Sequence, residues 1–163
     1  MTVLCISGTP GTGKTDVAKA LSKRLGWMSI SLNDLAESKD LYAGYDEERD
    51  CRIVDQDRIS AELDRSAEMH NLIAESHYAH DINCDWAIIL RTSPAELRER
   101  LKKRGWKPKK IEENALAEIM EVCKSEAMER GRKVLEFDTT GKTADAVADE
   151  IVAVLKKKKV IEV

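Results

Sequence analysis

A glycine-rich segment near the N-terminus, Gly8-Thr9-Pro10-Gly11-Thr12-Gly13-Lys14-Thr15, constrains what this chain can fold into. It matches the Walker A pattern, G-x-x-x-x-G-K-[ST]. An apolar run at 3–7 precedes it and an amphipathic segment at 16–25 follows, which predicts strand, turn and helix in the order that this loop requires. Its glycines let successive N–H groups face phosphate oxygens, and the helix adds its positive N-terminal end. A turn that only packs well would not need Lys-Thr at this spacing.

Composition limits the class of protein. A chain of 163 residues is expected to form one domain. Its net charge of −3 does not favour binding of a polyanion by the whole fold, so any nucleic-acid contact would be local. There is no run of about 18 apolar residues that would predict a transmembrane helix, and no signal peptide is expected. Four cysteines without a C-x-x-C spacing predict reduced thiols in a cytoplasmic protein.

The remaining pattern predicts an α/β fold. Short apolar runs at 3–7, 28–31, 72–74, 86–90 and 134–137 predict five strands. Amphipathic segments at 16–25, 34–38, 55–69, 94–104, 110–130 and 143–158 predict the helices between and after them. Strands that alternate with helices form parallel sheets through right-handed crossovers, and such sheets place their sites at the carboxyl ends of the strands.

Several local details accompany this pattern. We expect Asn33 and Ser93 to cap helices, and we read Asp55-x-Asp57 as a helix cap rather than a metal site. Residues 39–50 read as a long polar loop, followed by a short extended piece at 52–54. The helix at 110–130 is expected to bury one apolar stripe, formed by Leu116, Ile119, Met120, Cys123 and Ala127.

A basic segment surrounds a helix break two-thirds of the way along the chain. Residues 102–110 carry six cations around Gly105 and Pro108, as a mobile lid over nucleotide phosphates would. Arg100 and Arg104 are four residues apart, so one helix face can point both at a nucleotide. The alternative is a solvated basic helix end. Lysines 156–159 also suit the end of a helix, with an RNA contact as the alternative.

Candidate chemistry follows the third strand. Glu75 ends this strand, where P-loop proteins place a carboxylate that holds Mg²⁺ through water. His77 could orient a water molecule, contact a second substrate or serve only the fold. Glu75, His77, His80 and Cys84 fit no standard zinc spacing. We therefore expect Mg²⁺ between Thr15 and Glu75 rather than a separate metal site.

Five passages carry a resemblance to a known family. They are the P-loop itself, 41–48, 55–58, 90–92 and 104–106, and the acidic passage Tyr42-Ala43-Gly44-Tyr45-Asp46-Glu47-Glu48 is the most specific. Together they resemble the adenylate kinase isoenzyme 6 family, also called the coilin-interacting nuclear ATPase family, in an archaeal form. The resemblance covers nearly the whole chain.

This resemblance implies a P-loop nucleoside monophosphate (NMP) kinase-like fold with three α/β/α layers. It implies a five-stranded parallel sheet of order 2-3-1-4-5 in one domain spanning 1–163, an NMP-binding segment at about 31–54 and a lid at about 103–113. It also implies Mg²⁺- and ATP-dependent adenylate kinase activity (ATP + AMP to two ADP), ATPase activity and a role in small ribosomal subunit maturation. The implied partners are AMP or another NMP, a small-subunit ribosomal protein of the platform and the pre-ribosome.

The resemblance also assigns site residues. The residues carried over to the ATP phosphates are Gly11, Gly13, Lys14, Thr15 and Asp16, with Arg104 as the lid contact. Lys14, Glu75, His77 and Arg104 are the catalytic candidates, and Glu75 stands where an aspartate is expected, which bears on how water is positioned. Thr15 would bind Mg²⁺ directly and Glu75 through water.

The acceptor site is the part that the resemblance leaves open. Asp34, Arg52 and Arg91 are the candidate NMP ligands. Glu37 stands where many members carry an arginine for the AMP phosphate, so Arg49, Arg52 or Arg91 would have to replace it. Two alternatives remain: an ATP-driven assembly factor with little AMP kinase activity, and another small P-loop kinase acting on a metabolite or a pyrimidine monophosphate.

Overall fold

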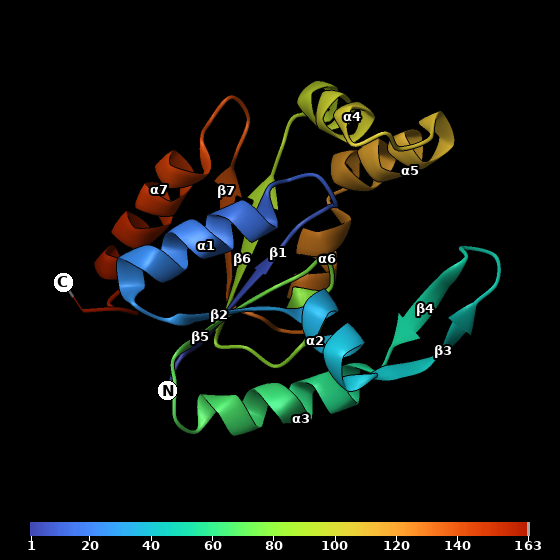
Figure 1. Ribbon diagram of the computed structural model, residues 1–163. Coiled ribbons are helices and arrows are strands. Elements are labelled where there is room, and N and C mark those ends of the chain that lie inside the picture. Colours follow the sequence, from blue (N-terminus) through green and yellow to red (C-terminus); the bar gives the residue numbers. More distant parts are fainter. Residues whose placement is uncertain (163) are drawn as a thin grey trace.

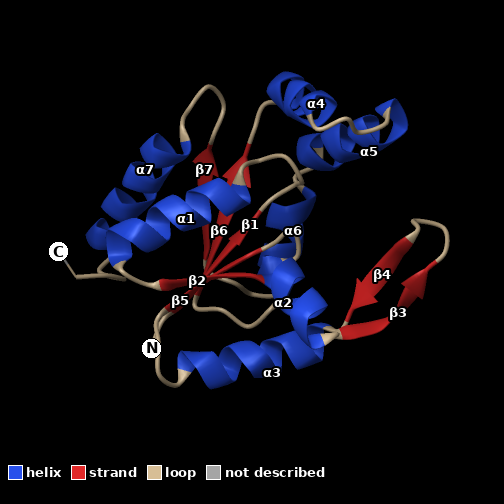
Figure 2. Cartoon of the chain, in the orientation of Figure 1, coloured by secondary structure: helices blue, strands red, loops and turns tan. Residues whose placement is uncertain are grey.

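A five-stranded parallel sheet forms the centre of the computed structural model, which describes residues 1–162. Its strands are β1 (Val3–Ser7), β2 (Met28–Ser31), β5 (Leu72–Glu75), β6 (Trp86–Arg91) and β7 (Val134–Asp138). They lie in the order β2-β5-β1-β6-β7, and every neighbouring pair is parallel. The α/β class and the parallel sheet are confirmed. The strand labels differ from the expected 2-3-1-4-5 because β3 and β4 lie outside this sheet and take two of the numbers (Figure 2).

Helices cover both faces of the sheet (Figure 1). Their bounds are α1 (Lys14–Leu25), α2 (Leu32–Lys39), α3 (Gln56–Ala67), a short 3₁₀ turn η1 (Ala79–Asp81), α4 (Pro94–Lys103), α5 (Pro108–Ile119), α6 (Val122–Glu129) and α7 (Ala144–Lys157). Successive residues of a strand point to opposite faces. Leu4 and Ile6 therefore pack with α1 and α7, whereas Val3 and Cys5 pack with α2, α3 and η1. Each of the helices described is too short or too polar to cross a membrane.

Helix starts follow the local sequence closely. The Ser93 side chain accepts a hydrogen bond from the Glu96 N–H, with Pro94 at the first helical position. Asp55 caps α3 by accepting from the Arg58 N–H, which confirms the interpretation of Asp55-x-Asp57 as a cap. The cap of α2 was expected at Asn33 and this is wrong. Ser31 caps that helix instead, because its hydroxyl lies 3.3 Å from the Asp34 N–H.

The passage expected as a polar loop forms a hairpin that projects from the body of the molecule (Figure 1). Its strands are β3 (Tyr42–Asp46) and β4 (Cys51–Val54), paired antiparallel. Most of its side chains are exposed, Tyr45 and Ile53 among them. A strand exposed on both faces has no alternating apolar pattern, so periodicity could not find it.

The single helix expected over 110–130 is also wrong. Glu121 has a φ of +55°, which separates α5 from α6. Leu116, Ile119 and Met120, expected in the buried stripe, are each more than half exposed. The buried side of α5 is Ile111, Ala115 and Glu118 instead. All three exposed residues precede the break, so the apolar stripe read from the sequence does not mark the buried face of α5.

Close packing of the P-loop against α4 gives a stability prediction. A Cβ on Gly11 would lie 2.8 Å from Leu97 Cδ1 and 2.9 Å from Leu101 Cδ2, at a φ of +96°. Overpacking and left-handed strain together should lower the free energy of unfolding of Gly11→Ala by about 3 kcal/mol. Gly26→Ala, at a φ of +70° with nothing within 4 Å of the added Cβ, should lose about 1 kcal/mol. Urea unfolding of both variants measures the difference, and equal losses would contradict it.

Candidate functional site

The P-loop joins β1 to α1 at the carboxyl edge of the sheet (Figure 1). The main-chain carbonyl of Thr9 accepts from the Thr12 N–H at 3.2 Å and from the Thr12 hydroxyl at 2.8 Å, which closes the turn. Gly13 caps α1 in the left-handed region and makes no side-chain cap bond. The first N–H groups of α1 therefore have no capping side chain, as an anion-binding helix end requires.

Lys14 extends over the loop. Its ammonium donates to the carbonyl oxygens of Gly8 at 3.0 Å and Thr9 at 3.2 Å. Removal from water lowers the pKa of Lys14 to about 8, and the positive charge of Arg104 acts in the same direction. The carboxylates of Glu75 and Glu118 oppose this shift. Lys14 thus lies among fixed charges of both signs, close to where phosphates would bind.

Thr15 and Glu75 meet as the sequence predicted. The Thr15 hydroxyl donates to Glu75 Oε1 at 3.1 Å, and β5 places Glu75 opposite Ile6 of β1. Glu75 is only 6% exposed although it is acidic. Hydroxyl and carboxylate oxygens are ligands that Mg²⁺ accepts together with water. The pair therefore fits a magnesium ion held directly by Thr15 and through water by Glu75.

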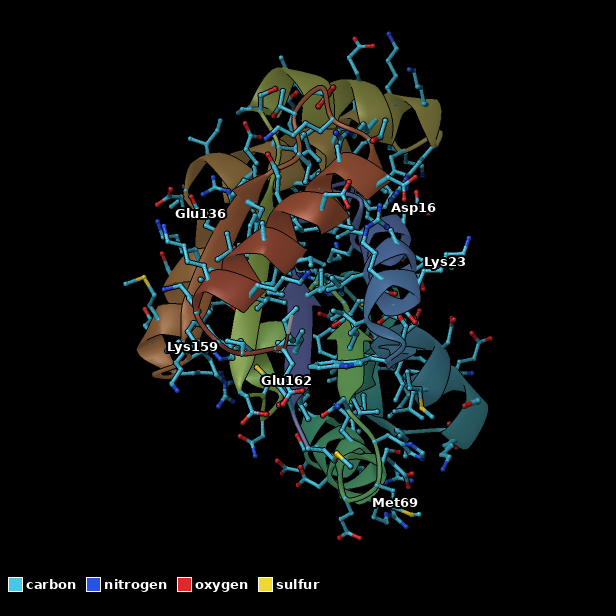
Figure 3. All side chains as sticks on the ribbon, turned by 90° about the vertical axis from the view of Figure 1, so that its left-hand side faces the viewer. Asp16, Lys23, Met69, Glu136, Lys159 and Glu162 are labelled. Carbon is cyan, nitrogen blue, oxygen red and sulfur yellow. The ribbon has the colours of Figure 1, made fainter. Side chains whose placement is uncertain are left out.

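A cavity of about 350 Å³ lies beside the P-loop, a volume typical of small-molecule sites. Residues expected at the ATP phosphates line it: Gly11, Gly13, Asp16 and Arg104. Arg100 also lines it, but its guanidinium is held by the Gly11 carbonyl at 3.2 Å, the Thr139 carbonyl at 3.1 Å and Glu96 at 2.8 Å. Figure 3 shows Asp16 near the start of α1 and Lys23 near its other end. The 139–142 loop and the start of α7 complete the cavity wall.

The two histidines after β5 have different surroundings. His77 is exposed beside Lys14, and partial removal from water and the charge of Lys14 lower the pKa of its imidazole. His80 is 1% exposed; its Nδ1 lies 2.6 Å from Ser7 Oγ and its Nε2 lies 2.8 Å from Glu126 Oε2. Within residues 1–162, the potential metal-binding side chains that cluster are His80, Asp81 and Glu126. The set Glu75, His77, His80 and Cys84 is not brought together.

The three candidate acceptor ligands belong to three different elements, α2, β4 and β6. Asp34 is exposed in the first turn of α2. Arg52 is exposed on β4, with its guanidinium 4.8 Å from the centre of the Tyr42 ring. Arg91 binds Glu118 and Glu121, with its Nε 3.1 Å from Glu118 Oε1 and its Nη1 2.9 Å from Glu121 Oε1. Its role as an NMP ligand would require it to leave these partners.

Two buried polar groups near the site carry no sequence signal. Glu118 is 3% exposed, although it lies on a helix with many exposed charges. The Tyr78 hydroxyl is buried without a hydrogen-bond partner among the described residues, and burial raises its pKa. Neither position stands out from periodicity or motif, because the groups that surround them come from distant parts of the chain.

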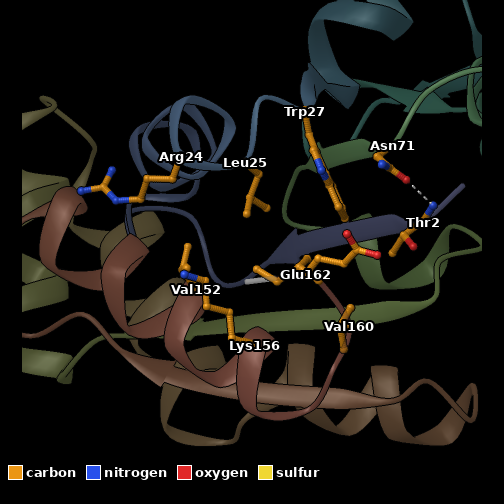
Figure 4. A pocket seen from close by; sticks show the side chains of 10 residues that line it. Thr2, Arg24, Leu25, Trp27, Asn71, Val152, Lys156, Val160 and Glu162 are labelled. Carbon is orange, nitrogen blue, oxygen red and sulfur yellow. Dashed lines mark hydrogen bonds between the residues drawn. The ribbon is translucent and has the colours of Figure 1, made fainter.

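A larger cavity, of about 520 Å³, lies at the opposite edge of the sheet (Figure 4). It is lined by Trp27, Arg24, Lys156 and the C-terminal residues before 163, together with Thr2, whose N–H donates to Asn71 Oδ1 at 2.8 Å. Thr2 and Asn71 precede β1 and β5, so this cavity opens at the amino ends of the strands. It has no part in the P-loop site.

Comparison with known proteins gives a consistent family. A family model described as an AAA domain matches residues 4–121. A protein of Methanocaldococcus jannaschii named "Putative adenylate kinase" is 40% identical over 157 residues, covering 96% of this chain and 87% of its own. One of the same name from Methanosarcina mazei is 43% identical, covering 90% of this chain and 83% of its own.

Solved structures share the fold at low identity. A shikimate kinase from Acinetobacter baumannii superposes with a TM-score of 0.67 at 15% identity, covering 99% of this chain and 96% of its own. A shikimate kinase from Bacteroides thetaiotaomicron gives 0.63 at 18% identity, covering 98% and 99%. A gluconokinase from Sinorhizobium meliloti gives 0.60 at 16% identity, covering 96% and 93%. These likenesses show that the chain shares the α/β fold of these proteins.

The low pKa of Lys14 predicts pH-dependent binding of ATP. Phosphate charges favour the ammonium form, so the bound protein keeps a proton that the free protein loses above pH 8. Affinity for a non-hydrolysable ATP analogue should hold between pH 7 and 8 and then fall, approaching tenfold per pH unit. Lys14→Arg, whose guanidinium stays charged throughout this range, should give a flat profile. Isothermal titration calorimetry measures both; a flat wild-type profile would contradict the assignment.

Proposed function

The chain belongs to the nucleoside monophosphate kinase family of these two archaeal relatives, and on this premise we propose that it is an adenylate kinase. It transfers the γ-phosphoryl group of ATP to AMP, yielding two ADP. The observation that carries the proposal is the P-loop itself, in which the Lys14 ammonium, the uncapped start of α1 and the Thr15–Glu75 pair converge.

Each part of the site has a role in this reaction. The N–H groups of the P-loop and α1 bind phosphate oxygens, and Lys14 exchanges its carbonyl partners for the β- and γ-phosphates. Arg104, exposed at the rim of the cavity, neutralises charge that develops on the transferred group. Mg²⁺, when bound with ATP, neutralises further phosphate charge. Glu75 orients the water molecules around that ion, and His77 faces the acceptor.

Two projecting segments complete the proposed enzyme. We assign residues 31–54, with the β3–β4 hairpin, to acceptor binding and residues 103–113 to a lid, within one domain spanning the chain. The hairpin projects from the body of the molecule (Figure 1). The lid segment packs its Trp106 on Leu97, Leu101 and Ile111. This apolar contact fixes the base of the lid and leaves its cations exposed.

A coupled assay tests the kinase activity. Purified protein with Mg²⁺ and ATP should form ADP in an AMP-dependent manner. Lys14→Ala should lower kcat/KM by at least 10²-fold, since removal of a comparable preorganised charge contact costs about 3 kcal/mol. Shikimate, gluconate and pyrimidine monophosphates serve as alternative acceptors in the same assay. If one of these replaces AMP as the preferred acceptor, the adenylate kinase proposal fails.

A second activity, hydrolysis of ATP, is favoured by the state of the acceptor residues. Arg91 is held by carboxylates, Arg52 is stacked on Tyr42, and Glu37 is exposed on α2 near the expected AMP phosphate. With no arginine fixed for AMP, water can act as the acceptor. We propose that this hydrolysis serves a cytoplasmic role in small-subunit maturation. The resemblance to the isoenzyme 6 family supports a platform ribosomal protein and the pre-ribosome as partners.

Affinity capture tests this second role. Tagged protein incubated with archaeal lysate should retain a small-subunit ribosomal protein, identified by mass spectrometry. Retention should increase with Lys14→Ala or a non-hydrolysable analogue, because a slowed hydrolysis step would delay release. Failure to retain any small-subunit protein in every nucleotide state would contradict the assembly role and leave the kinase assay unaffected.

A further inference from the structure

Glu118 is a buried carboxylate near the end of α5, and its side chain accepts hydrogen bonds from three donors in two other segments. The Thr92 N–H donates to its Oε2 at 2.8 Å. Arg91 Nε and the Thr9 hydroxyl donate to its Oε1 at 3.1 and 3.2 Å. With a side chain 3% exposed, a carboxylate is stable only when it is paired and hydrogen-bonded in this way. Glu118 therefore joins α5 to the P-loop and to the end of β6.

Thr9 links Glu118 to Lys14. The hydroxyl of Thr9 binds Glu118, while its main-chain carbonyl accepts from Lys14 Nζ at 3.2 Å and from the Thr12 hydroxyl at 2.8 Å. Thr9 is therefore hydrogen-bonded to both residues, to Glu118 through its hydroxyl and to Lys14 through its carbonyl.

Arg91 fixes Glu118 from the other side. Its Nη2 donates to the Glu118 carbonyl at 2.7 Å and its Nη1 to Glu121 Oε1 at 2.9 Å, so it spans the break between α5 and α6. The guanidinium therefore holds both the side chain and the backbone of Glu118 in place. This rigid pair explains why Arg91, at a strand end that suggests substrate binding, faces α5.

We propose that Glu118 is a positioning residue for phosphoryl transfer. Through Thr9 it holds the P-loop carbonyls and Lys14 in the geometry that receives the triphosphate. This inference rests on the proposed function, because it concerns the same P-loop. A carboxylate that served only the fold would stabilise the protein without affecting the phosphoryl-transfer step.

The variant Glu118→Gln separates these roles. Glutamine keeps the size of the side chain and removes its charge. Its NH2 group replaces one carboxylate oxygen, so at least one of the three donors loses its acceptor. The kcat of the variant should drop on the order of tenfold, as expected for a misplaced catalytic group, while its KM for ATP changes less than its kcat. Glu129→Gln removes the same charge from an exposed position on α6 and should match the wild type in both measurements.

Thr9 provides an independent test in case Glu118→Gln does not fold. Thr9→Val removes one hydroxyl and leaves Arg91 and the Thr92 N–H on Glu118, so kcat should fall while the helices stay intact by circular dichroism. Thr9→Ser restores the hydroxyl and should restore kcat. Folded Glu118→Gln or Thr9→Val protein with wild-type kcat overturns the inference. Wild-type protein that fails to bind or turn over ATP overturns the proposed function instead.

Discussion

The charged groups around Lys14, at the carboxyl edge of the sheet, determine what the rest of the site can bind. Lys14 rests on carbonyl oxygens of its own loop, and the nearby carboxylates of Glu75 and Glu118 oppose the loss of its proton. A cation in such a place is costly to bury and is stable only while oxygen atoms surround it. A triphosphate can supply those oxygens. Binding then replaces carbonyl partners with phosphate partners and leaves the carboxylates in place behind them.

The parts of this fold that the sequence predicts are those with local causes. The P-loop is a contiguous pattern, and the three inner strands β5, β1 and β6 are short apolar runs that are buried on both faces. Caps such as Ser93 and Asp55 act within three residues of themselves. The meeting of Thr15 and Glu75 follows from the same logic, because parallel strands that are neighbours bring their carboxyl ends to one edge.

What the sequence did not predict depends on contacts between distant segments. The β3–β4 hairpin exposes most of its side chains, and the break at Glu121 occurs inside a run of good helix formers. Glu118 has the composition of a surface residue, and its partners Thr92 and Thr9 lie 26 and 109 positions away. Arg91 shows the same difficulty for function. Its position at a strand end suggests a substrate ligand, but its contact with Glu118 on α5 cannot be deduced from the sequence.

These long-range contacts divide the segment after β6 into two parts with different mechanical roles. Glu118 before the break and Glu126 after it both reach the β1–P-loop segment, the first through Thr9 and the second through His80 and Ser7. The end of α5 and Glu126 on α6 are therefore linked by hydrogen bonds to β1 and the P-loop. The start of α5 and the turn before it carry exposed cations instead, packed through Trp106 on α4. The residue that holds the P-loop and the exposed cations thus lie at opposite ends of α5.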